Sequence, residues 1–333
     1  MRKLFFITTI LSSFILSGFA RADKPVLDVY TYDYFASEWG PGPLIKQSFE
    51  ATCDCSVNYV VTADSVAMLS KILLEGKNSK ADVLVGLDNN IARRAADSGL
   101  FAPHQVVPPK FSAPSVIWQS PLFAPFDWGV FSFIYNQETL TNPPKSFADL
   151  QNLPKETKIV LQDPRTSTPG YGLLLWLDTI DALGSDAAWK AMRPNILTFT
   201  KGWSDAYNMY LEGQADLVLS YTTSPAYHII AEGTDKHKAA IFDEGHLAQV
   251  ELAGVIAHSA ELELGRAFVA HLQSKEVQSI IPTTNWMFPI RDDVPLPDGF
   301  KGLPMPEKLF VADPDKSEKM RKNRIQRWQA AVQ

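Results

Sequence analysis

Short runs of apolar residues alternate along the chain with segments in which apolar positions recur at helical spacing. The short runs predict buried strands, and the periodic segments predict helices. The last helix starts after Asp313, which can cap it, with proline at its first position. Strands that alternate with helices are typical of an α/β fold with mainly parallel sheets. We predict strands at 26–30, 57–61, 82–85, 159–161, 196–199 and 217–219, and helices at 43–50, 65–75, 91–98, 173–183, 205–211, 262–273 and 314–332.

Two longer apolar segments differ from the short ones. Residues 126–135 and 249–257 each contain a glycine, which within a strand often marks a bend or a close approach of another backbone. We predict that these two strands carry the chain from one lobe to another and back. This organisation gives a first lobe of residues 23–125 and 258–333 and a second lobe of residues 126–257.

A weak internal repeat favours two similar lobes. Leu74-Glu75-Gly76 precedes the segment Ala-Asp-Val-Leu-Val at 81–85, and Leu211-Glu212-Gly213 precedes Ala-Asp-Leu-Val-Leu at 215–219. In both copies the glycine is placed to end a helix before a strand begins. The alternative is that unrelated helix–strand units look alike.

The first 22 residues have the layout of a secretory signal peptide. Arg2 and Lys3 form a basic start, residues 4–16 are mostly apolar, and Ala20-Arg21-Ala22 is a small-x-small cleavage site. Phe19 stands where a lipid-accepting cysteine would be. We therefore expect a soluble exported protein that is cleaved after Ala22.

Charge and composition narrow the class of partner. The chain of 333 residues has 46% hydrophobic and 20% charged residues, which is ordinary for a globular protein. Its 31 basic and 37 acidic residues give a net charge of −6. A protein that grips nucleic acid through its phosphates has a basic excess instead, so we expect no nucleic-acid partner.

The two cysteines, Cys53 and Cys55, are separated by one residue. In an exported protein a pair is more often oxidised than free, which favours a disulfide. Such a bridge closes a very small loop and contributes little stability. A metal site would need further ligands nearby, and the sequence offers none.

The segments that follow the predicted strands carry the candidate chemistry, because ligands of open α/β sheets bind beyond the carboxyl ends of the strands. Hydroxyl and acidic residues precede predicted helices at Asp64-Ser65, Thr168-Pro169, Ser204 and Ser224-Pro225. They can act as helix caps, and a helix N-terminus can also bind an anion such as phosphate. Aromatic rings at these exits can stack on a planar ligand or hold a cation: Tyr32, Trp39, Trp203, Tyr221 and Tyr227.

Enzyme motifs are weak or absent. The segment 202–206 (GWSDA) resembles the elbow that presents a nucleophilic serine, and Asp243 with His258 or His271 follows in the order of a hydrolase. So loose a motif is common by chance. The sequence contains no H-E-x-x-H, no G-x-G-x-x-G and no phosphate-binding loop of nucleotide hydrolases. We therefore predict no catalytic residue, no metal and no cofactor, and keep a hydrolase as the alternative.

Seven stretches that span nearly the whole mature chain closely resemble the periplasmic thiamine-binding proteins of bacterial ABC importers. The resemblance implies a type II periplasmic-binding-protein fold, in which two α/β lobes enclose a ligand cleft. It also implies a periplasmic location. The stretches are VYTYDYF (29–35), WGPGP (39–43), EGKNSKADVLVGLDNN (75–90), QDPRTSTPGYGLLLW (162–176), TKGWSDAY (200–207), DLVLSYTTSPAYH (216–228) and IPTTNWMFP (281–289).

The ligand implied by this resemblance is thiamine, or its monophosphate or diphosphate. The implied partners are the permease and ATPase subunits of the importer. A flat aminopyrimidine suits stacking on a ring, the cationic thiazolium suits rings and Asp64, and phosphate esters suit Ser167, Thr168 and Ser224 near helix starts. The implied binding positions are Asp64, Ser65, Ser167, Thr168, Trp203, Tyr221, Thr222, Thr223 and Ser224, with Tyr32, Trp39, Tyr227 and Trp286 as further contacts.

Two other ligands of the same fold class fit the sequence less well. Iron sites usually have adjacent tyrosines with histidine or acidic ligands, but Thr222 follows Tyr221 and His228 has no obvious partner in the sequence. A polyamine site needs several carboxylates, and the loops after the strands contain few.

Overall fold

The protein is described by a computed structural model that covers residues 24–113, 116–180 and 185–333. The predicted signal peptide, its cleavage site and the end of the predicted helix at 173–183 lie outside these residues. None of the described helices is long and apolar enough to cross a membrane.

The first lobe is built on three parallel strands in the order β2-β1-β3. Side chains of β3 alternate between two cores, since successive residues of a strand face opposite sides. Val83 and Val85 pack with helices α2 and α10, whereas Leu84 packs with α3. Leu87 lies on the same side as Leu84, because the register with β10 shifts at Gly86 and the alternation is interrupted there. The elements are β1 (Val26–Tyr32), β2 (Ser56–Thr62), β3 (Val83–Asp88), β4 (Phe101–Ala102), α1 (Asp33–Ala36), α2 (Gly42–Cys53), α3 (Ser65–Glu75), α4 (Ala92–Asp97), α10 (Leu262–Leu272), α11 (Lys275–Thr284) and β11 (Phe288–Pro289).

The second lobe repeats this plan with parallel strands in the order β8-β6-β7. Helix α8 packs on all three strands, and α6 packs on β6 and β8. Its elements are α5 (Phe147–Gln151), β6 (Ile159–Gln162), α6 (Thr168–Ile180), α7 (Ser185–Met192), β7 (Ile196–Thr200), α8 (Trp203–Leu211), β8 (Leu217–Tyr221), α9 (Pro225–Ala231) and β9 (His237–Ala240).

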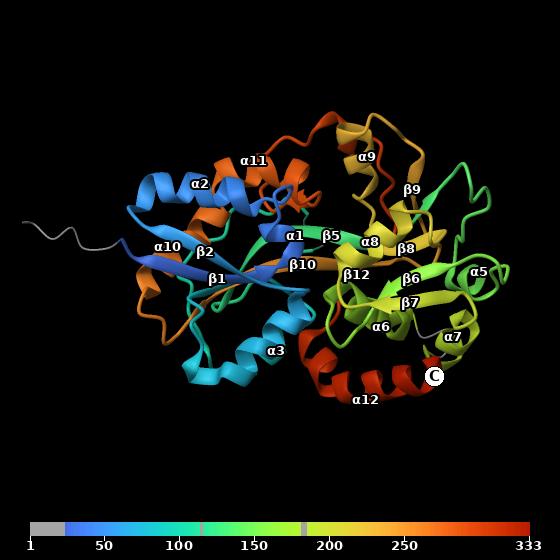
Figure 1. The fold of residues 1–333 in the computed structure, drawn as a ribbon, viewed down its shortest axis with the longest axis horizontal. Helices are drawn as coiled ribbons and strands as arrows, with labels where there is room; N and C mark the ends of the chain where they lie inside the picture. The colour runs from blue at the N-terminus through green and yellow to red at the C-terminus, as the bar shows by residue number, and fades with distance from the viewer. Residues whose placement is uncertain (1–23, 114–115, 181–184) are drawn as a thin grey trace, which may run out of the picture.

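Two long antiparallel strands, β5 (Phe123–Asn136) and β10 (His246–Ile256), join the lobes. β10 pairs with β3 of the first lobe, and β5 pairs with β8 of the second. They run through the middle of the molecule, with the lobes on either side (Figure 1). The predicted crossing of the chain on two long strands is therefore confirmed. The exact lobe boundaries stay a prediction, because both strands continue through them.

The predicted strands and most predicted helices are present, with shifted ends. Helix α6 begins at Thr168, five residues before the predicted start, because Pro169 occupies the first turn, where a missing N–H costs nothing. The repeat corresponds to the units α3–β3 and α8–β8, and Gly76 and Gly213, which follow these helices, both have positive φ. Helix α11 was not predicted, and it contains Pro282.

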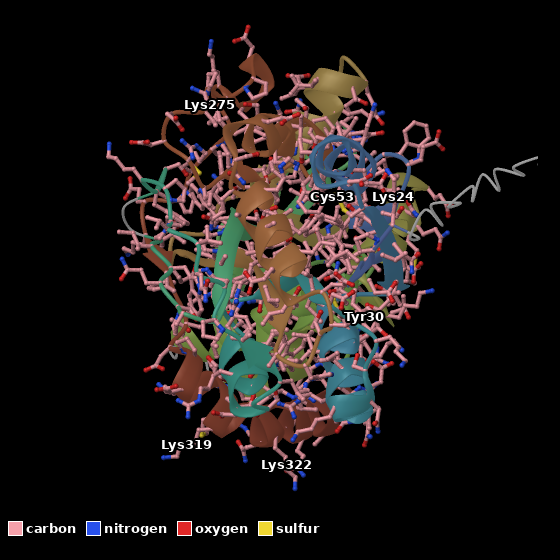
Figure 2. All side chains as sticks on the ribbon, turned by 90° about the vertical axis from the view of Figure 1, so that its left-hand side faces the viewer. Lys24, Tyr30, Cys53, Lys275, Lys319 and Lys322 are labelled. Carbon is pink, nitrogen blue, oxygen red and sulfur yellow. A yellow bond between two sulfur atoms is a disulfide. The ribbon has the colours of Figure 1, made fainter. Side chains whose placement is uncertain are left out.

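The C-terminal helix α12 (Pro314–Val332) lies along the second lobe, although the predicted first lobe included it. Arg324 pairs with Asp178 of α6, and Arg327 pairs with Asp186 of α7. Arg93 of α4 pairs with Asp315, so the helix also contacts the first lobe. The predicted solvated face of this basic helix includes Lys319 and Lys322, which point outward in Figure 2. A short strand, β12 (Leu309–Phe310), precedes the helix and pairs with β10.

Cys53 and Cys55 form the disulfide that their exported context favours. Cys53 is the last residue of α2, and Asp54 between the two cysteines has the left-handed φ of 49°. The bridge therefore closes the turn between α2 and β2, at the end of the first lobe far from the second (Figures 1 and 2).

Candidate functional site

A cavity of about 790 Å³ lies between the two lobes. Its volume is in the range of small-molecule sites. Most of the predicted binding positions line it, and they come from both lobes. These are Tyr32, Trp39, Asp64, Ser65, Thr168, Trp203, Tyr221, Ser224, Tyr227 and Trp286.

Asp64 is the centre of the contact between the lobes. Its Oδ1 accepts hydrogen bonds from the N–H groups of Ser65 (2.7 Å) and Thr168 (3.1 Å), and its Oδ2 accepts one from the N–H of Trp203 (3.2 Å). These N–H groups belong to the first turns of α3, α6 and α8. One carboxylate thus caps three helices, two of which are in the other lobe, and we call this set the Asp64 junction.

Burial and hydrogen bonding have opposite effects on the pKa of Asp64 in this junction. Burial raises the pKa of Asp64 to about 6, because the charged form loses its hydration. The Ser167 hydroxyl and the three backbone N–H groups act in the opposite direction and favour the carboxylate. Helix N-termini are positively polarised, so Asp64 occupies the position in which an anion would be most stable.

Further contacts bring the lobes together around the cavity. Ser204 of α8 donates a hydrogen bond to Asp33 of α1 at 2.9 Å. A Cβ added to Gly202 would lie 2.4 Å from the carbonyl oxygen of Ala63, so only glycine permits this approach of the two backbones. The lobes are therefore in a closed arrangement.

Aromatic rings form much of the cavity wall on the second lobe. Trp203 stacks on Tyr207 with ring centroids 4.8 Å apart, and its indole N–H donates to Ser220 at 2.8 Å. Tyr221 stacks on Phe131 and donates its hydroxyl proton to Gln249 at 2.9 Å. Fixed rings of this kind can stack on a planar ligand or hold a cation over their faces.

Trp286 belongs to the first lobe and meets the second. Its φ of 56° is unusual for a residue other than glycine, and such strain is concentrated at functional sites. The indole N–H donates to the Tyr34 hydroxyl at 2.9 Å, and the ring lies edge-on to Tyr227, with centroids 5.2 Å apart.

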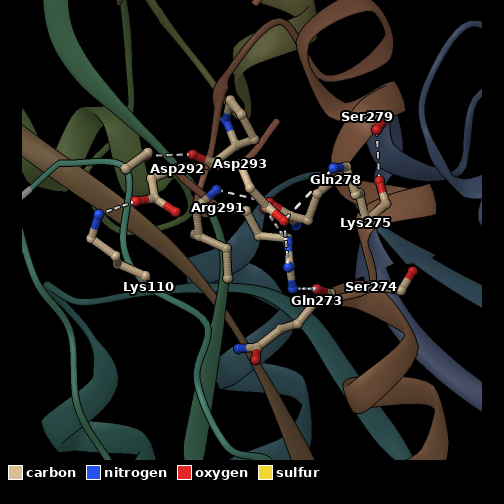
Figure 3. Close-up of polar contacts among 12 residues, drawn as sticks. Lys110, Gln273, Ser274, Lys275, Gln278, Ser279, Arg291, Asp292 and Asp293 are labelled. Carbon is tan, nitrogen blue, oxygen red and sulfur yellow. Dashed lines mark hydrogen bonds and ion pairs between the residues drawn. The ribbon is translucent and has the colours of Figure 1, made fainter. Parts of the chain in front are cut away.

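The segment that carries Trp286 is held in place by polar contacts on both of its sides (Figure 3). The Gln278 side chain accepts from the N–H of Ile290 at 2.8 Å and donates to the carbonyl of Leu272. Arg291 forms two hydrogen bonds with Asp293. These contacts join α11 to the end of α10 and to the residues that directly follow β11.

Three acidic residues on adjacent strands lie beside the cavity: Asp88, Asp127 and Glu251. Glu251 of β10 stands opposite Asp88 of β3 and opposite Asp127 of β5 in the sheet register, and it lines the cavity. Asp88 is bonded by the N–H groups of Asn90 and Ile91. Tyr32 donates to Glu251 Oε2 at 2.8 Å, and Asn285 donates to Asp127 Oδ2 at 2.6 Å.

Burial raises the pKa of each of these three groups. The pKa of Asp88 rises to about 7 and that of Asp127 to about 8. The pKa of Glu251 rises well above its usual value, first by burial and then by the neighbouring charge of Asp127. No lysine, arginine or histidine lines the cavity among the residues that the structure describes. The cavity is therefore suited to a cation.

Three predicted binding positions do not line the cavity. Ser167, Thr222 and Thr223 are wholly buried. The turn from β8 into α9 directs Tyr221 and Ser224 to the cavity and the two intervening threonines into the protein. The predicted capping roles also differ, because Gly202 rather than Ser204 precedes α8, and Ser224 makes no capping hydrogen bond through its side chain.

The hydrolase alternative predicted a histidine base beside Ser204, and the described structure places a carboxylate there instead. The Ser204 hydroxyl donates to Asp33 rather than to a histidine. His271 is bonded to Ser48, on α2 of the first lobe. Within the described chain, no histidine lines the cavity.

His228 has partners that the sequence did not reveal. Its ring bonds to the Tyr207 hydroxyl at 2.9 Å and to Glu232 at 2.7 Å, and it stacks on His237 at 3.8 Å. The donor atoms of His228, Glu232 and His237 lie within 4.8 Å of one another, as in a metal site. Both nitrogens of His228 are already bonded, however, to Tyr207 and to Glu232. The group therefore serves to hold Tyr207 behind Trp203.

Several cavity residues were missed by the sequence analysis. Tyr34 closely follows the strand predicted at 26–30, so the rule that rings at strand exits line the site could have included it. Tyr207 lies inside the helix predicted at 205–211, where a ring has no such local meaning. Glu251 lies inside an apolar strand, and Asn285 lies at the end of a helix that was not predicted. Local sequence gives no signal for these two.

The chain matches known proteins along nearly its full length. The family model described as bacterial extracellular solute-binding protein matches residues 45–308. The thiamine-binding periplasmic protein of Salmonella typhimurium is 46% identical over 309 residues, which are 93% of this chain and 94% of that protein. A protein of the same name from Brucella abortus is 43% identical over 333 residues, 100% of this chain and 99% of that protein. A solved structure, a periplasmic thiamin binding protein, has a TM-score of 0.90 and 46% identity, and the match covers 93% of this chain and 97% of that chain.

Proposed function

This chain belongs to the family of bacterial extracellular solute-binding proteins, and on that premise we propose that it captures thiamine in the periplasm and delivers it to an ABC importer. Its two lobes around a cavity are the type II periplasmic-binding-protein fold. The full-length similarity to thiamine-binding periplasmic proteins supports the choice of ligand. The observation that carries the proposal is a cavity lined by aromatic rings and carboxylates contributed by both lobes.

The chemistry of thiamine fits this cavity. Its aminopyrimidine is flat and can stack on rings such as Trp203 or Tyr221, and its thiazolium is a permanent cation. Cations are favoured over aromatic faces and beside carboxylates, and three acidic residues, Asp33, Asp64 and Glu251, line the cavity. The same absence of basic side chains disfavours a ligand whose recognised group is an anion.

Thiamine monophosphate and thiamine diphosphate are proposed as weaker ligands of the same cleft. The helix N-termini best placed for a phosphate are those of the Asp64 junction, which Asp64 already occupies. A phosphate there meets a like charge unless Asp64 is protonated or moves away. Asp64→Asn should therefore improve the affinity of the phosphate esters relative to that of thiamine. An unchanged order of affinities in this variant would contradict the argument.

The proposed partners are the permease and ATPase subunits of the importer, to which the closed protein presents its ligand. The protein itself is proposed to release thiamine unchanged, without catalysis. Incubation with thiamine and its phosphate esters, followed by chromatography, tests this point, and any product of hydrolysis would revive the enzyme alternative.

Export is proposed to leave a mature chain that begins at Asp23. Mass spectrometry of the periplasmic fraction should give the mass of the chain without residues 1–22. A retained leader or a lipid adduct would refute this cleavage.

Calorimetry and small-angle scattering together test the proposed capture. Thiamine should bind with one site per chain, and saturation should reduce the radius of gyration, because a ligand that contacts both lobes favours the closed state. Choline, a cation without the heterocycles, is the matched control and should bind much more weakly. A failure of thiamine to bind would refute the function, and unchanged scattering at saturation would refute closure.

A further inference from the structure

Asp127 and Glu251, which we call the acid pair, are two buried carboxyl groups whose side-chain hydrogen-bond partners among the described residues are Tyr32, Gln249 and Asn285, none of them basic. They stand opposite each other on β5 and β10. Asp127 is fully buried and Glu251 is 6% exposed. Two carboxylates this close in a medium of low polarity repel each other, so both cannot be charged without a cation nearby.

The hydrogen bonds around the acid pair leave part of it unsatisfied. Asp127 receives one bond on Oδ2, from Asn285, and its buried Oδ1 has no partner. Glu251 receives one short bond on Oε2, from Tyr32, while Gln249 Nε2 lies 3.5 Å from Oε1. Native proteins rarely leave a buried carboxylate oxygen without a donor, which indicates that a proton or a ligand completes this arrangement.

The acid pair is in contact with the cavity through Glu251. Tyr32 and Asn285, which bond to the pair, line the same cavity. A group bound there therefore lies within reach of the Glu251 carboxyl. Because the described lining contains no basic side chain, any positive charge at this place must come from the ligand.

We propose that Glu251 is the group that recognises the positive charge of the ligand, and that the acid pair holds one proton which leaves when the cation binds. This inference rests on the proposed capture of thiamine and names the residue that selects its charge. The proton passes from a carboxyl O–H to solvent, and the cation takes its place as the partner of the carboxylate. No other bond is made or broken.

Other groups that face the pair also affect its ionisation, in both directions. Asp88 on β3, at the register position next to Glu251, and Asp64 at the start of α3 both disfavour its ionisation. Tyr32 on β1 favours the Glu251 carboxylate by its hydrogen bond. Tyr221 on β8 remains a neutral phenol, because burial and the surrounding acids raise its pKa. The pKa of Asp127, about 8, agrees with a proton held at neutral pH.

Proton release can be measured directly by calorimetry of thiamine binding in two buffers with different ionisation enthalpies. For the wild-type protein near pH 7 we expect release of up to about one proton per ligand. Glu251→Gln should abolish this release and weaken thiamine binding by about 10- to 100-fold, the range for a lost hydrogen bond or contact to a charged group. Asp127→Asn should reduce the release and retain tight binding, since Glu251 then ionises without its competitor.

A neutral analogue separates recognition of charge from general packing. In an analogue of thiamine with a thiophene in place of the thiazolium, the cation is lost and the shape is kept. The wild-type protein should prefer thiamine to this analogue about 10-fold or more, and Glu251→Gln should lose most of the preference. If the variant weakens both ligands equally, Glu251 does not select the charge.

Two controls distinguish the possible failures. Glu263→Gln makes the same change at an exposed position of α10 and should alter neither affinity nor proton release. Infrared spectra of the ligand-free protein near pH 7 should show a protonated carboxyl band that Glu251→Gln weakens, and the part that remains should belong to Asp88. If the wild-type protein does not bind thiamine, the proposed function is refuted. If the wild-type protein binds thiamine but Glu251→Gln has the same affinity and proton release, this inference alone is overturned. The absence of the protonated carboxyl band from the wild-type protein would also overturn it.

Discussion

Asp64 and Glu251 are buried carboxyl groups beside the same cavity, and their surroundings differ in one respect. Asp64 faces three backbone N–H groups at helix starts, two of them from the other lobe. Glu251 faces Asp127 and receives one short hydrogen bond, from Tyr32. Burial raises the pKa of both groups, but only Asp64 has positively polarised neighbours within the protein. A carboxylate with such neighbours joins the lobes, whereas one without them is available to a cationic ligand.

The largest expected effect appears when each carboxylate is removed in turn and the free energy of unfolding is measured. Asp64→Ala leaves three buried N–H groups without an acceptor, so it should lower the free energy of unfolding by about 2–4 kcal/mol. Glu251→Gln removes a buried ionisable group and keeps the shape, so the stability of the ligand-free protein should be equal or higher. Urea denaturation of both variants measures the two changes. Equal losses in the two variants would show that the two carboxyl groups have the same structural role.

The contrast also explains what the sequence could predict. Asp64 was found because it stands between a predicted strand and a predicted helix, where an acidic residue has a local meaning as a cap. The functional meaning of Glu251 depends on its register with Asp127 and Asp88, which are more than a hundred residues away in the chain. Register between distant strands is not visible in an apolar run, so the acid pair could not be predicted.

The sequence also predicted those parts of the fold that depend on local patterns, and not those that depend on distant contacts. Strands and helices with strong apolar patterns were found within a few residues, and the two glycine-containing long strands indicated the crossing between lobes. The side on which α12 packs was not predictable, because it depends on ion pairs such as Arg324 with Asp178. The family resemblance assigned Thr222 and Thr223 to the site, but both are buried and neither lines the cavity.

Trp203 allows the ring contact to be separated from the Asp64 junction. Its backbone N–H bonds to Asp64, whereas its ring stacks on Tyr207 at the cavity wall. Trp203→Ala keeps the N–H and should weaken thiamine binding by roughly 1–3 kcal/mol, as for a stacked base on an aromatic ring. Calorimetry measures the loss. Trp39→Ala is the matched control, because Trp39 is 76% exposed and should contribute less. A larger effect at Trp39 would place the vitamin at the rim of the cavity.

The pH dependence of stability should report on the acid pair. An acid whose pKa is raised by folding binds protons more tightly in the folded state, so its stabilising effect is complete at low pH and lost as pH rises through the folded value. For Asp127 that window lies between the unfolded value, about 4, and about 8. The ligand-free protein should lose up to about 1.4 kcal/mol per pH unit and titrating group in this window.

Denaturation at several pH values checks this slope. Asp127→Asn should flatten it, because one partner of the pair no longer titrates. Saturating thiamine should also flatten it, because the cation lowers the pKa of the pair. A wild-type stability that rises between about pH 5 and pH 8 would have the opposite sign and would contradict a proton held by the acid pair.

The smallest expected effect concerns Ser167, which the sequence offered as a phosphate contact and the structure places behind the cavity. Its hydroxyl is buried and favours the Asp64 carboxylate. Ser167→Ala should therefore lower stability by about 1 kcal/mol and weaken thiamine, its monophosphate and its diphosphate to the same extent. Melting temperature and three affinities measured on one preparation separate this outcome from the alternative. A selective loss of affinity for the two phosphorylated ligands would mean that their phosphate reaches the helix starts despite Asp64. Asp64 would then be the acceptor of the helix N–H groups only when no phosphate ester is bound.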